Sequence, residues 1–218
     1  MSNLLKRIIT SILLAVVLLF CLFYNKNLWL LLLLLVSIIS FFEFSKLINK
    51  IFKNRNISIA LINLTTLFYL IFFTFSAYDL AEVNVNIFFV ILVCIFSDIG
   101  GYVVGKTVGG KKLTKISPNK TVSGSIGSFV FSFIPLFIFS ILFYEKINSL
   151  FINLIFLSIF ISLISQVGDL FISFFKRKAG VKDTGNILPG HGGILDRIDG
   201  MIFAIPVTFI FNEMFLKL

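Results

Sequence analysis

Apolar residues fill almost the whole chain in stretches of about 20, separated by short polar segments. A helix needs about 20 such residues to cross roughly 30 Å of hydrocarbon, so the pattern predicts a series of transmembrane helices. We expect seven spans, at 8–24, 28–48, 57–78, 86–104, 124–144, 149–175 and 197–216. The predicted fold is an all-α, polytopic membrane protein with a single transmembrane domain over 1–218.

Composition agrees with this pattern. With 58% hydrophobic residues and 29 Phe among 218 residues, the chain has more apolar surface than a soluble core of this size could bury. Both cysteines, Cys21 and Cys94, fall within apolar spans. This placement indicates packing residues, with neither a disulfide nor a metal site implied.

Positive charge is distributed unevenly between the predicted loops. Of the 19 Lys and Arg residues, 16 fall on one side of the predicted membrane, and only Lys26, Lys146 and Lys217 fall on the other. Because Lys and Arg concentrate in cytoplasmic loops, we expect a cytoplasmic N-terminus and an outside C-terminus. Topology and anionic lipid headgroups therefore explain the net charge of +9, and nucleic-acid binding is not expected.

Polar residues gather in two predicted cytoplasmic segments, of which the first is 97–127. Residues 100–107 match the P-loop pattern, but a membrane span precedes them where a P-loop needs a strand, so we reject that match. Five lysines lie within 106–120, a stretch that contains no acid, and they suit several phosphate oxygens, although an ordinary cytoplasmic loop would also be basic. The substrate-binding residues that we expect in this loop are Lys112, Ser117, Lys120 and Thr121.

Asp98 is harder to explain by topology alone. It ends an apolar run, where a carboxylate costs about 2–3 kcal/mol unless it is paired or lines a wet cavity. Asp98 therefore predicts a nearby cation.

The second polar segment, 165–200, begins inside the sixth span. On a helix, Asp169, Ser173 and Lys176 lie at i, i+4 and i+7, which places a carboxylate and a cation on about one face. The glycine-rich stretch that follows predicts a loop folding over the site. Asp196 and Asp199 then share a helix face at i, i+3, and carboxylates this close repel unless a cation lies between them.

These carboxylates predict a divalent metal site at the cytoplasmic face. Mg²⁺ typically binds one or two carboxylates while substrate phosphates complete its shell, and a second cation is left open. The metal ligands that we expect are Asp98, Asp169, Asp196 and Asp199, and the catalytic set adds Lys176 and Arg177 to the last three. The substrate-binding residues in this segment are Ser173, Lys182, Asp183, His191, Gly192, Gly193 and Arg197. The alternative is a set of Asp–Lys and Asp–Arg pairs that stabilise helix packing.

The segment from Ser173 to Asp199 resembles the signature of the phosphatidate cytidylyltransferase, or CDP-diacylglycerol synthase, family. The likeness is carried by Ser173, Lys176-Arg177, Lys182-Asp183, Pro189, His191-Gly192-Gly193, Asp196-Arg197 and Asp199. Similar stretches at 98–102, 116–121 and 166–169 extend it over 97–200. The resemblance implies transfer of CMP from CTP to phosphatidic acid, release of pyrophosphate, and metal held by aspartates at the cytoplasmic face.

The sequence departs from the family at Ser123, where members commonly have Glu, and the chain looks short for the family.

The spacing typical of a CDP-alcohol phosphatidyltransferase is absent. A CTP-dependent polyprenol or phytol kinase stays open, as does a cation transporter, although a transporter's acids should be spread through the spans. The expected partners are CTP, phosphatidic acid and membrane lipids, and a homodimer is left open.

Overall fold

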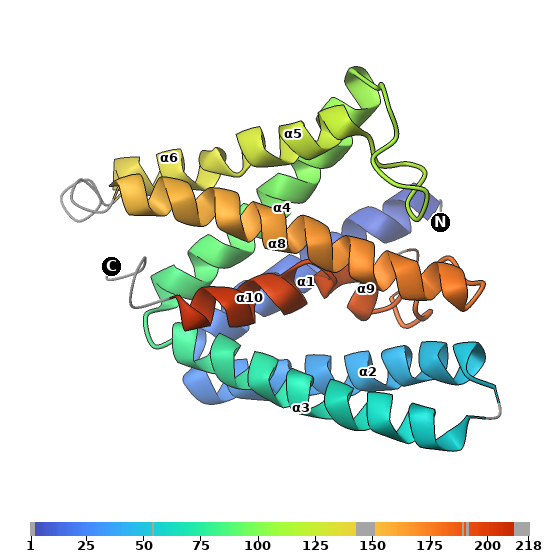
Figure 1. Cartoon of the computed structure of the whole chain (residues 1–218). Helices are drawn as coiled ribbons and strands as arrows, with labels where there is room; N and C mark the ends of the chain where they lie inside the picture. The colour runs from blue at the N-terminus through green and yellow to red at the C-terminus, as the bar shows by residue number, and fades with distance from the viewer. Residues whose placement is uncertain (1–2, 54, 143–150, 189, 191, 212–218) are drawn as a thin grey trace. The chain divides into compact units, whose positions relative to one another are not determined.

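The computed structural model describes residues 3–53, 55–142, 151–188, 190 and 192–211. Within these residues the chain forms helices and two isolated β-bridges but no strand, which confirms the all-α fold class (Figure 1). The helices are α1 (Asn3–Tyr24), α2 (Lys26–Ile51), α3 (Asn56–Leu80), α4 (Asn84–Thr107), α5 (Val122–Phe131), α6 (Phe133–Leu142), α8 (Phe151–Lys178), α9 (Leu195–Ile198) and α10 (Met201–Ile210).

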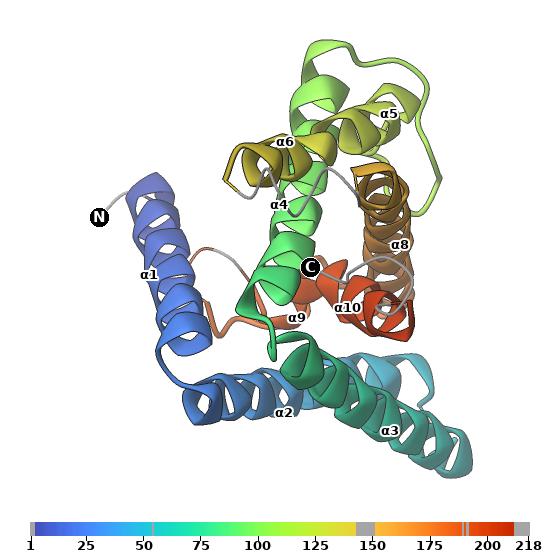
Figure 2. The ribbon, with the colours of Figure 1, turned by 90° about the vertical axis from the view of Figure 1, so that its left-hand side faces the viewer.

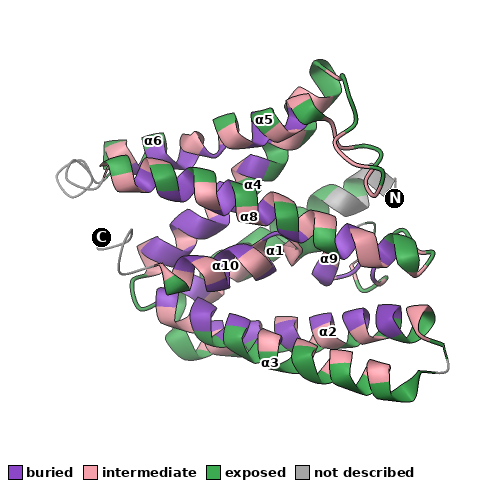
Figure 3. Ribbon diagram, viewed as in Figure 1, coloured by how far each residue is buried: buried purple, intermediate pink, exposed green. Residues whose placement is uncertain are grey.

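Five segments are long and apolar enough to cross a membrane, and they coincide with the second to sixth predicted spans. They are Lys26–Ile51, Asn56–Leu80, Asn84–Thr107, Val122–Leu142 and Phe151–Lys178. The first and last predicted spans contain shorter apolar helices, Ile8–Tyr24 and Met201–Ile210, and residues 212–216 of the last one lie outside the described part of the chain. Exposed residues recur along these helices (Figure 3). Many of them are Leu, Ile and Phe, as expected for surfaces that face lipid. The chain is therefore a membrane protein, while the count of seven spans stays a prediction.

The span predicted as one helix over 124–144 is interrupted. α5 ends at Phe131, Ser132 caps it, and α6 begins at Phe133. Pro135 has no N–H to donate to the carbonyl four residues earlier, and its ring crowds that carbonyl, so a continuous α-helix is disfavoured at this point. The Ser132 hydroxyl instead donates to the Phe129 carbonyl at 2.7 Å.

The chain divides into two compact units. Unit 1 consists of Met1–Glu82 and Phe174–Asp199, and unit 2 consists of Val83–Ser173 and Gly200–Leu218. α8 therefore belongs to unit 2 for most of its length and to unit 1 in its last residues. The single transmembrane domain expected over 1–218 stays a prediction.

In unit 1, α2 and α3 form an antiparallel pair, and α1 packs against α2 (Figure 2). Two polar contacts join the pair inside its apolar surface. The indole N–H of Trp29 donates to the Ala77 carbonyl at 3.1 Å, and the hydroxyls of Ser37 and Thr74 lie 2.8 Å apart. These contacts fix the register of α2, the helix that carries a buried carboxylate at Glu43.

In unit 2, α4 and α5 pack at very close range because glycines line their contact. A Cβ at Gly127 would lie 2.5 Å from the Val104 Cβ and 2.7 Å from the Gly100 carbonyl oxygen. A Cβ at Gly124 would lie 2.7 Å from the Gly101 carbonyl oxygen. Small residues let membrane helices approach in this way. The close crossing sets the position of the segment that joins the two helices.

Residues 100–107, which match the P-loop pattern, lie inside α4. A phosphate-binding loop needs free backbone N–H groups, and those of a helix interior are already bonded. The rejection of the P-loop interpretation is confirmed.

Candidate active site

A cavity with a volume of about 300 Å³ lies in unit 2, between α4, α5, α8 and the segment that joins α4 to α5. It gathers carboxylates, a cation and neutral polar groups from segments distant in the sequence. The polar residues lining it that matter for the chemistry are Asp98, Ser117, Asn119, Lys120, Thr121 and Asp169. The structure thus brings five residues of the predicted site together in one unit and adds Asn119.

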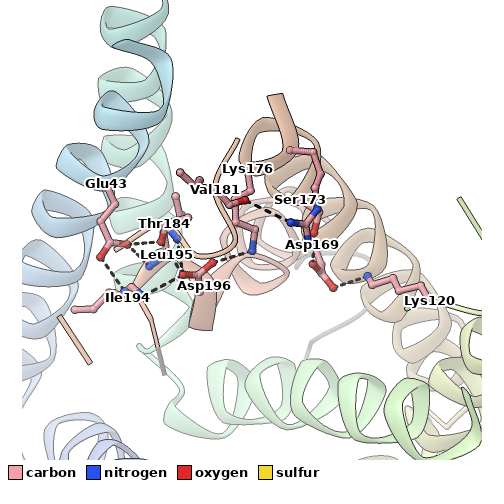
Figure 4. A network of polar contacts seen from close by, with 12 residues as sticks. Glu43, Lys120, Asp169, Ser173, Lys176, Val181, Thr184, Ile194, Leu195 and Asp196 are labelled. Carbon is pink, nitrogen blue, oxygen red and sulfur yellow. Dashed lines mark hydrogen bonds and ion pairs between the residues drawn. The ribbon is translucent and has the colours of Figure 1, made fainter. Parts of the chain in front are cut away.

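Asp169 forms an ion pair with Lys120, and each side chain is 27% exposed. The Ser173 hydroxyl, one helical turn away on α8, donates to the same carboxylate at 3.2 Å (Figure 4). Asp169 therefore has the nearby cation that a carboxylate in an apolar helix requires. In this arrangement the cation is a lysine ammonium, close to one wall of the cavity.

The segment that carries Lys120 is shaped by its own backbone and by two hydroxyls. Lys111 and Leu113 pair with Val122 and Lys120 through backbone hydrogen bonds of 2.9 and 2.8 Å. Thr121 caps α5 by accepting the Gly124 N–H at 3.0 Å. This pairing leaves Lys112 exposed and outside the cavity lining, while Lys120 faces the cavity.

Ser123, which stands where family members commonly have Glu, has a structural contact here. Its hydroxyl lies 3.0 Å from that of Thr121 and donates to the Gly109 carbonyl. Gly109 has φ +65°, a conformation that glycine adopts without strain. Ser123 therefore ties the start of the joining segment to its end.

A second polar cluster lies in unit 1, around Asp196. The side chain of Asp196 is 3% exposed and accepts the Lys176 ammonium at 2.7 Å. Its other oxygen accepts the backbone N–H groups of Thr184 and Gly193 at 2.7 and 3.0 Å, and lies 3.0 Å from the Thr184 hydroxyl (Figure 4). These contacts match the alternative that the sequence left open, in which an Asp–Lys pair organises the structure. A metal-binding role for Asp196 stays a prediction.

The pKa of Asp196 reflects two opposing causes. Burial by itself would raise the pKa, but the hydrogen bond from Lys176 and the N–H groups of Gly193 and Thr184 outweigh it. The pKa is therefore held below the ordinary value of 3.8.

We expect the loop between α8 and α9 to lose stability only in acid. A carboxyl whose pKa is lowered by folding stabilises the folded state above its unfolded pKa, and this contribution disappears as the pH falls through the folded pKa. The amides of Thr184 and Gly193 should therefore stay protected from hydrogen exchange at pH 5 and lose protection below about pH 4. Asp196→Asn should remove this dependence. Protection already lost between about pH 5 and 7 would contradict the assignment.

Glu43 on α2 was not predicted from the sequence, although it is among the most deeply buried polar residues, at 2% exposure. Its carboxylate accepts the Thr184 hydroxyl at 2.8 Å and the backbone N–H groups of Ile194 and Leu195 at 3.1 and 2.9 Å. The signal was present in the sequence, because Glu43 follows a long apolar run just as Asp98 does.

The other predicted residues of unit 1 lie at its surface or at the end of α9. Arg177, Lys182, Asp183 and Arg197 are exposed, and Arg177 donates to the Val181 carbonyl at 3.4 Å. Asp199 is half-buried at the end of α9, Gly192 and Gly193 belong to the loop before that helix, and His191 lies outside the described residues. Among the residues that the structure describes, no group of three or more His, Cys, Asp or Glu side chains could hold a metal ion.

Comparison with known proteins identifies the family. The profile of the cytidylyltransferase family matches residues 53–215. The chain belongs to the cytidylyltransferase family. The resemblance noted from the signature residues is thereby confirmed, and the matched region includes the cavity of unit 2 and the loop before α9. Glu43 lies before the matched region.

Three curated relatives of this cytidylyltransferase family member come from bacteria. The chain is 42% identical over 130 residues to the phosphatidate cytidylyltransferase of Bacillus subtilis (strain 168), covering 59% of this chain and 48% of that protein. It is 44% identical over 128 residues to that of Rickettsia bellii (strain RML369-C), covering 55% and 54%. It is 41% identical over 121 residues to that of Helicobacter pylori (strain ATCC 700392 / 26695), covering 55% and 44%. The chain spans about half the length of the curated relatives it matches.

Proposed function

We propose that this chain is a nucleotidyltransferase that transfers CMP from CTP to phosphatidic acid and releases pyrophosphate. The observation that carries the proposal is the cavity of unit 2, where Lys120 and neutral donors face two carboxylates, Asp98 and Asp169. Donors of this kind suit phosphate oxygens, and carboxylates suit the cation that accompanies a triphosphate. The choice of CTP and phosphatidic acid as substrates follows from the name of the relatives, phosphatidate cytidylyltransferase.

The proposed chemistry needs no general base from the protein. The phosphate of phosphatidic acid is already ionised near pH 7, so one of its oxygens can attack the α-phosphorus of CTP directly. A new bond forms between that oxygen and the α-phosphorus, while the bond to the oxygen bridging the α- and β-phosphorus breaks and pyrophosphate leaves. The task of the protein is positioning and charge neutralisation. Lys120, with Ser117 beside it, would hold phosphate oxygens in the cavity, while Thr121 stays a proposed contact on the sequence pattern alone because its hydroxyl is bonded to Ser123 and Gly124.

The carboxylates of the cavity fit a divalent cation. Asp98 and Asp169 line the same cavity, and Mg²⁺ commonly takes one or two carboxylates and completes its shell with substrate phosphates and water. A bound Mg²⁺ would neutralise charge on the triphosphate. Asp169 would then exchange part of its contact with Lys120 for the metal. Asp196 and Asp199 stay proposed ligands on the sequence pattern alone, and a second cation stays open.

The proposed roles of the unit 1 residues follow from their charge and backbone. Arg177 and Lys182 are exposed cations available to phosphate, whereas Lys176 is held by Asp196. The glycines at 192 and 193 keep the loop backbone unobstructed by side chains, which suits contact with phosphate oxygens.

Isotope transfer tests the proposed reaction directly. With phosphatidic acid and Mg²⁺ present, label at the α-phosphate of CTP should enter a lipid product, and label at the γ-phosphate should appear only in pyrophosphate. The reason is that cytidylyl transfer breaks the bond between the α-phosphorus and the β-bridging oxygen. γ-Label arriving in lipid would replace the assignment with a CTP-dependent lipid kinase. No transfer by a folded preparation would favour a cation transporter.

We also propose seven membrane spans with the N-terminus cytoplasmic and the C-terminus outside, in the inner membrane of a bacterium, with the active site facing the cytoplasm. Support comes from the distribution of Lys and Arg, 16 of 19 on one side. A reporter fused after Lys217 should report the outside, and one inserted within 178–190 should report the cytoplasm. Both reporters on one side would exclude the seven-span topology.

A further inference from the structure

Glu43 is a buried carboxylate whose partners all come from one distant segment. None of the ion pairs among the described residues involves it, and each of its three hydrogen bonds leads to the segment from Thr184 to Leu195. More than 140 residues separate Glu43 from these partners along the chain. Burying a carboxylate costs free energy unless the carboxylate is fully hydrogen-bonded. These three hydrogen bonds therefore offset the cost of burying Glu43 in α2.

The two backbone contacts complete the start of α9. The first N–H groups of a helix have no partner inside the helix, and Ile194 supplies no side-chain cap. Glu43 accepts the N–H groups of Ile194 and Leu195, while Asp196 accepts that of Gly193. Two buried carboxylates therefore hold three successive backbone N–H groups at the end of the loop.

The close approach of Glu43 explains two glycines of the loop. A Cβ at Gly185 would lie 2.5 Å from Oε1 of Glu43, and a Cβ at Gly193 would lie equally close to the same oxygen. Neither position has room for a side chain while the carboxylate is in place. Glycine is therefore required at both positions where the loop backbone passes close to the Glu43 carboxylate.

Thr184 connects the two carboxylates. Its hydroxyl lies 2.8 Å from Oε2 of Glu43 and 3.0 Å from Oδ2 of Asp196, and Oδ1 of Asp196 accepts Lys176 (Figure 4). A continuous series of polar contacts thus runs from α2 to the end of α8. Moving Glu43 would disturb the positions of Thr184 and Asp196.

We propose that Glu43 is a positioning residue, which holds the glycine-rich loop from Thr184 to Leu195 and, through Thr184, sets the position of Asp196. The proposal rests on the proposed function, because it matters for catalysis only if this loop meets phosphate. It extends that function to a helix that precedes the region matched by the family profile.

Hydrogen exchange of the substrate-free protein tests the structural part. Glu43→Gln keeps the size of the side chain but turns one acceptor into a donor that faces other donors. The amides of Gly193, Ile194 and Leu195 should then exchange about 10- to 100-fold faster, as expected for the loss of hydrogen bonds to a buried charged group. The matched control is Ser40→Ala, which removes a buried hydroxyl without a described partner one turn earlier on α2 and should leave these amides unchanged.

Kinetics test the positioning part. In Glu43→Gln, KM for CTP or phosphatidic acid should rise about tenfold, with a smaller change in kcat, because a looser loop binds phosphate less well. Thr184→Val should change KM in the same direction, and the double variant should be little worse than Glu43→Gln alone, because the contact between Glu43 and Thr184 is already disturbed in that variant. If Glu43→Gln does not fold, Thr184→Val gives the same measurement from the loop side.

The possible outcomes separate the two proposals. Exchange needs no substrate, so faster exchange at 193–195 supports the positioning role even if no cytidylyl transfer is found. Wild-type exchange at these amides would overturn the role, and so would equal loss of protection throughout α2 and α3. A fall in kcat alone, with unchanged exchange, would also overturn it.

Discussion

Replacing Asp169 with Asn is expected to lower turnover of CTP by about two to three orders of magnitude while the protein stays folded. The amide oxygen of Asn can still accept the Ser173 hydroxyl and a hydrogen bond from Lys120, so local packing is preserved. What disappears is the negative charge beside the cavity, which the proposed chemistry needs for a cation. The measurement is the initial rate of pyrophosphate release at increasing Mg²⁺.

The Mg²⁺ dependence distinguishes metal binding by the Asp169 carboxylate from a role limited to its ion pair with Lys120. If Asp169 holds the metal, Asp169→Asn should require more Mg²⁺, whereas Lys120→Gln should lower the rate without raising the Mg²⁺ requirement, because Lys120 competes with the metal for Asp169. Glu82→Gln is the matched control, because it removes a carboxylate from an exposed pair with Lys26 that lies outside the cavity. Near-normal turnover in Asp169→Asn at saturating Mg²⁺ would remove Asp169 from the active site.

Gly127→Ala is expected to destabilise the protein by about 1–3 kcal/mol, the usual cost of inserting a methyl group into a packed contact. The added Cβ would lie 2.5 Å from the Val104 Cβ and 2.7 Å from the Gly100 carbonyl, so α5 must move away from α4. The residues lining the cavity come from both helices, and activity should fall with stability. Thermal unfolding in detergent measures the first effect.

Ile126→Ala provides the comparison for this change. Ile126 precedes Gly127 on α5 but is 59% exposed, so its truncation creates no clash with α4. Its unfolding temperature should stay close to that of the wild type. An equal loss in both variants would mean that α5 is generally sensitive to substitution and that the α4–α5 contact is not special.

The sequence predicted those parts of the fold that depend on local pattern. Apolar length alone located α2, α3, α4 and α8 to within a few residues, because span length follows from membrane thickness. The break before α6 could have been read from Pro135, whose effect on a helix is also local. A cation near Asp98 was anticipated because Asp98 ends an apolar run, and it lines the cavity together with Lys120. The ion pair between Asp169 and Lys120 was not anticipated, because the sequence places Asp169 on the same helix face as Lys176.

The rest depended on contacts between distant segments. The apolar run before Glu43 indicates that its carboxylate needs partners, but nothing near it in the sequence shows that Thr184 and Leu195 provide them. Asp196 was expected to bind metal because it shares a helix face with Asp199, and this stays a prediction; that Thr184 and Lys176 contact it could not be read from the sequence. The charge of a carboxylate in an apolar setting predicts that a cation or hydrogen-bond donors lie nearby. Only the folded chain shows which residues provide them.

The position of Glu43 bears on how this protein can be cut and recombined. A fragment starting at residue 53 would contain the whole region that the family profile matches. It would nevertheless lack the carboxylate of Glu43, which accepts the backbone N–H groups of Ile194 and Leu195. Chimaeras that exchange this region between relatives should therefore carry α2 together with the loop from Thr184 to Leu195. The region that the family profile matches begins after the end of α2, whereas the part of the chain that has to be exchanged as a unit includes α2.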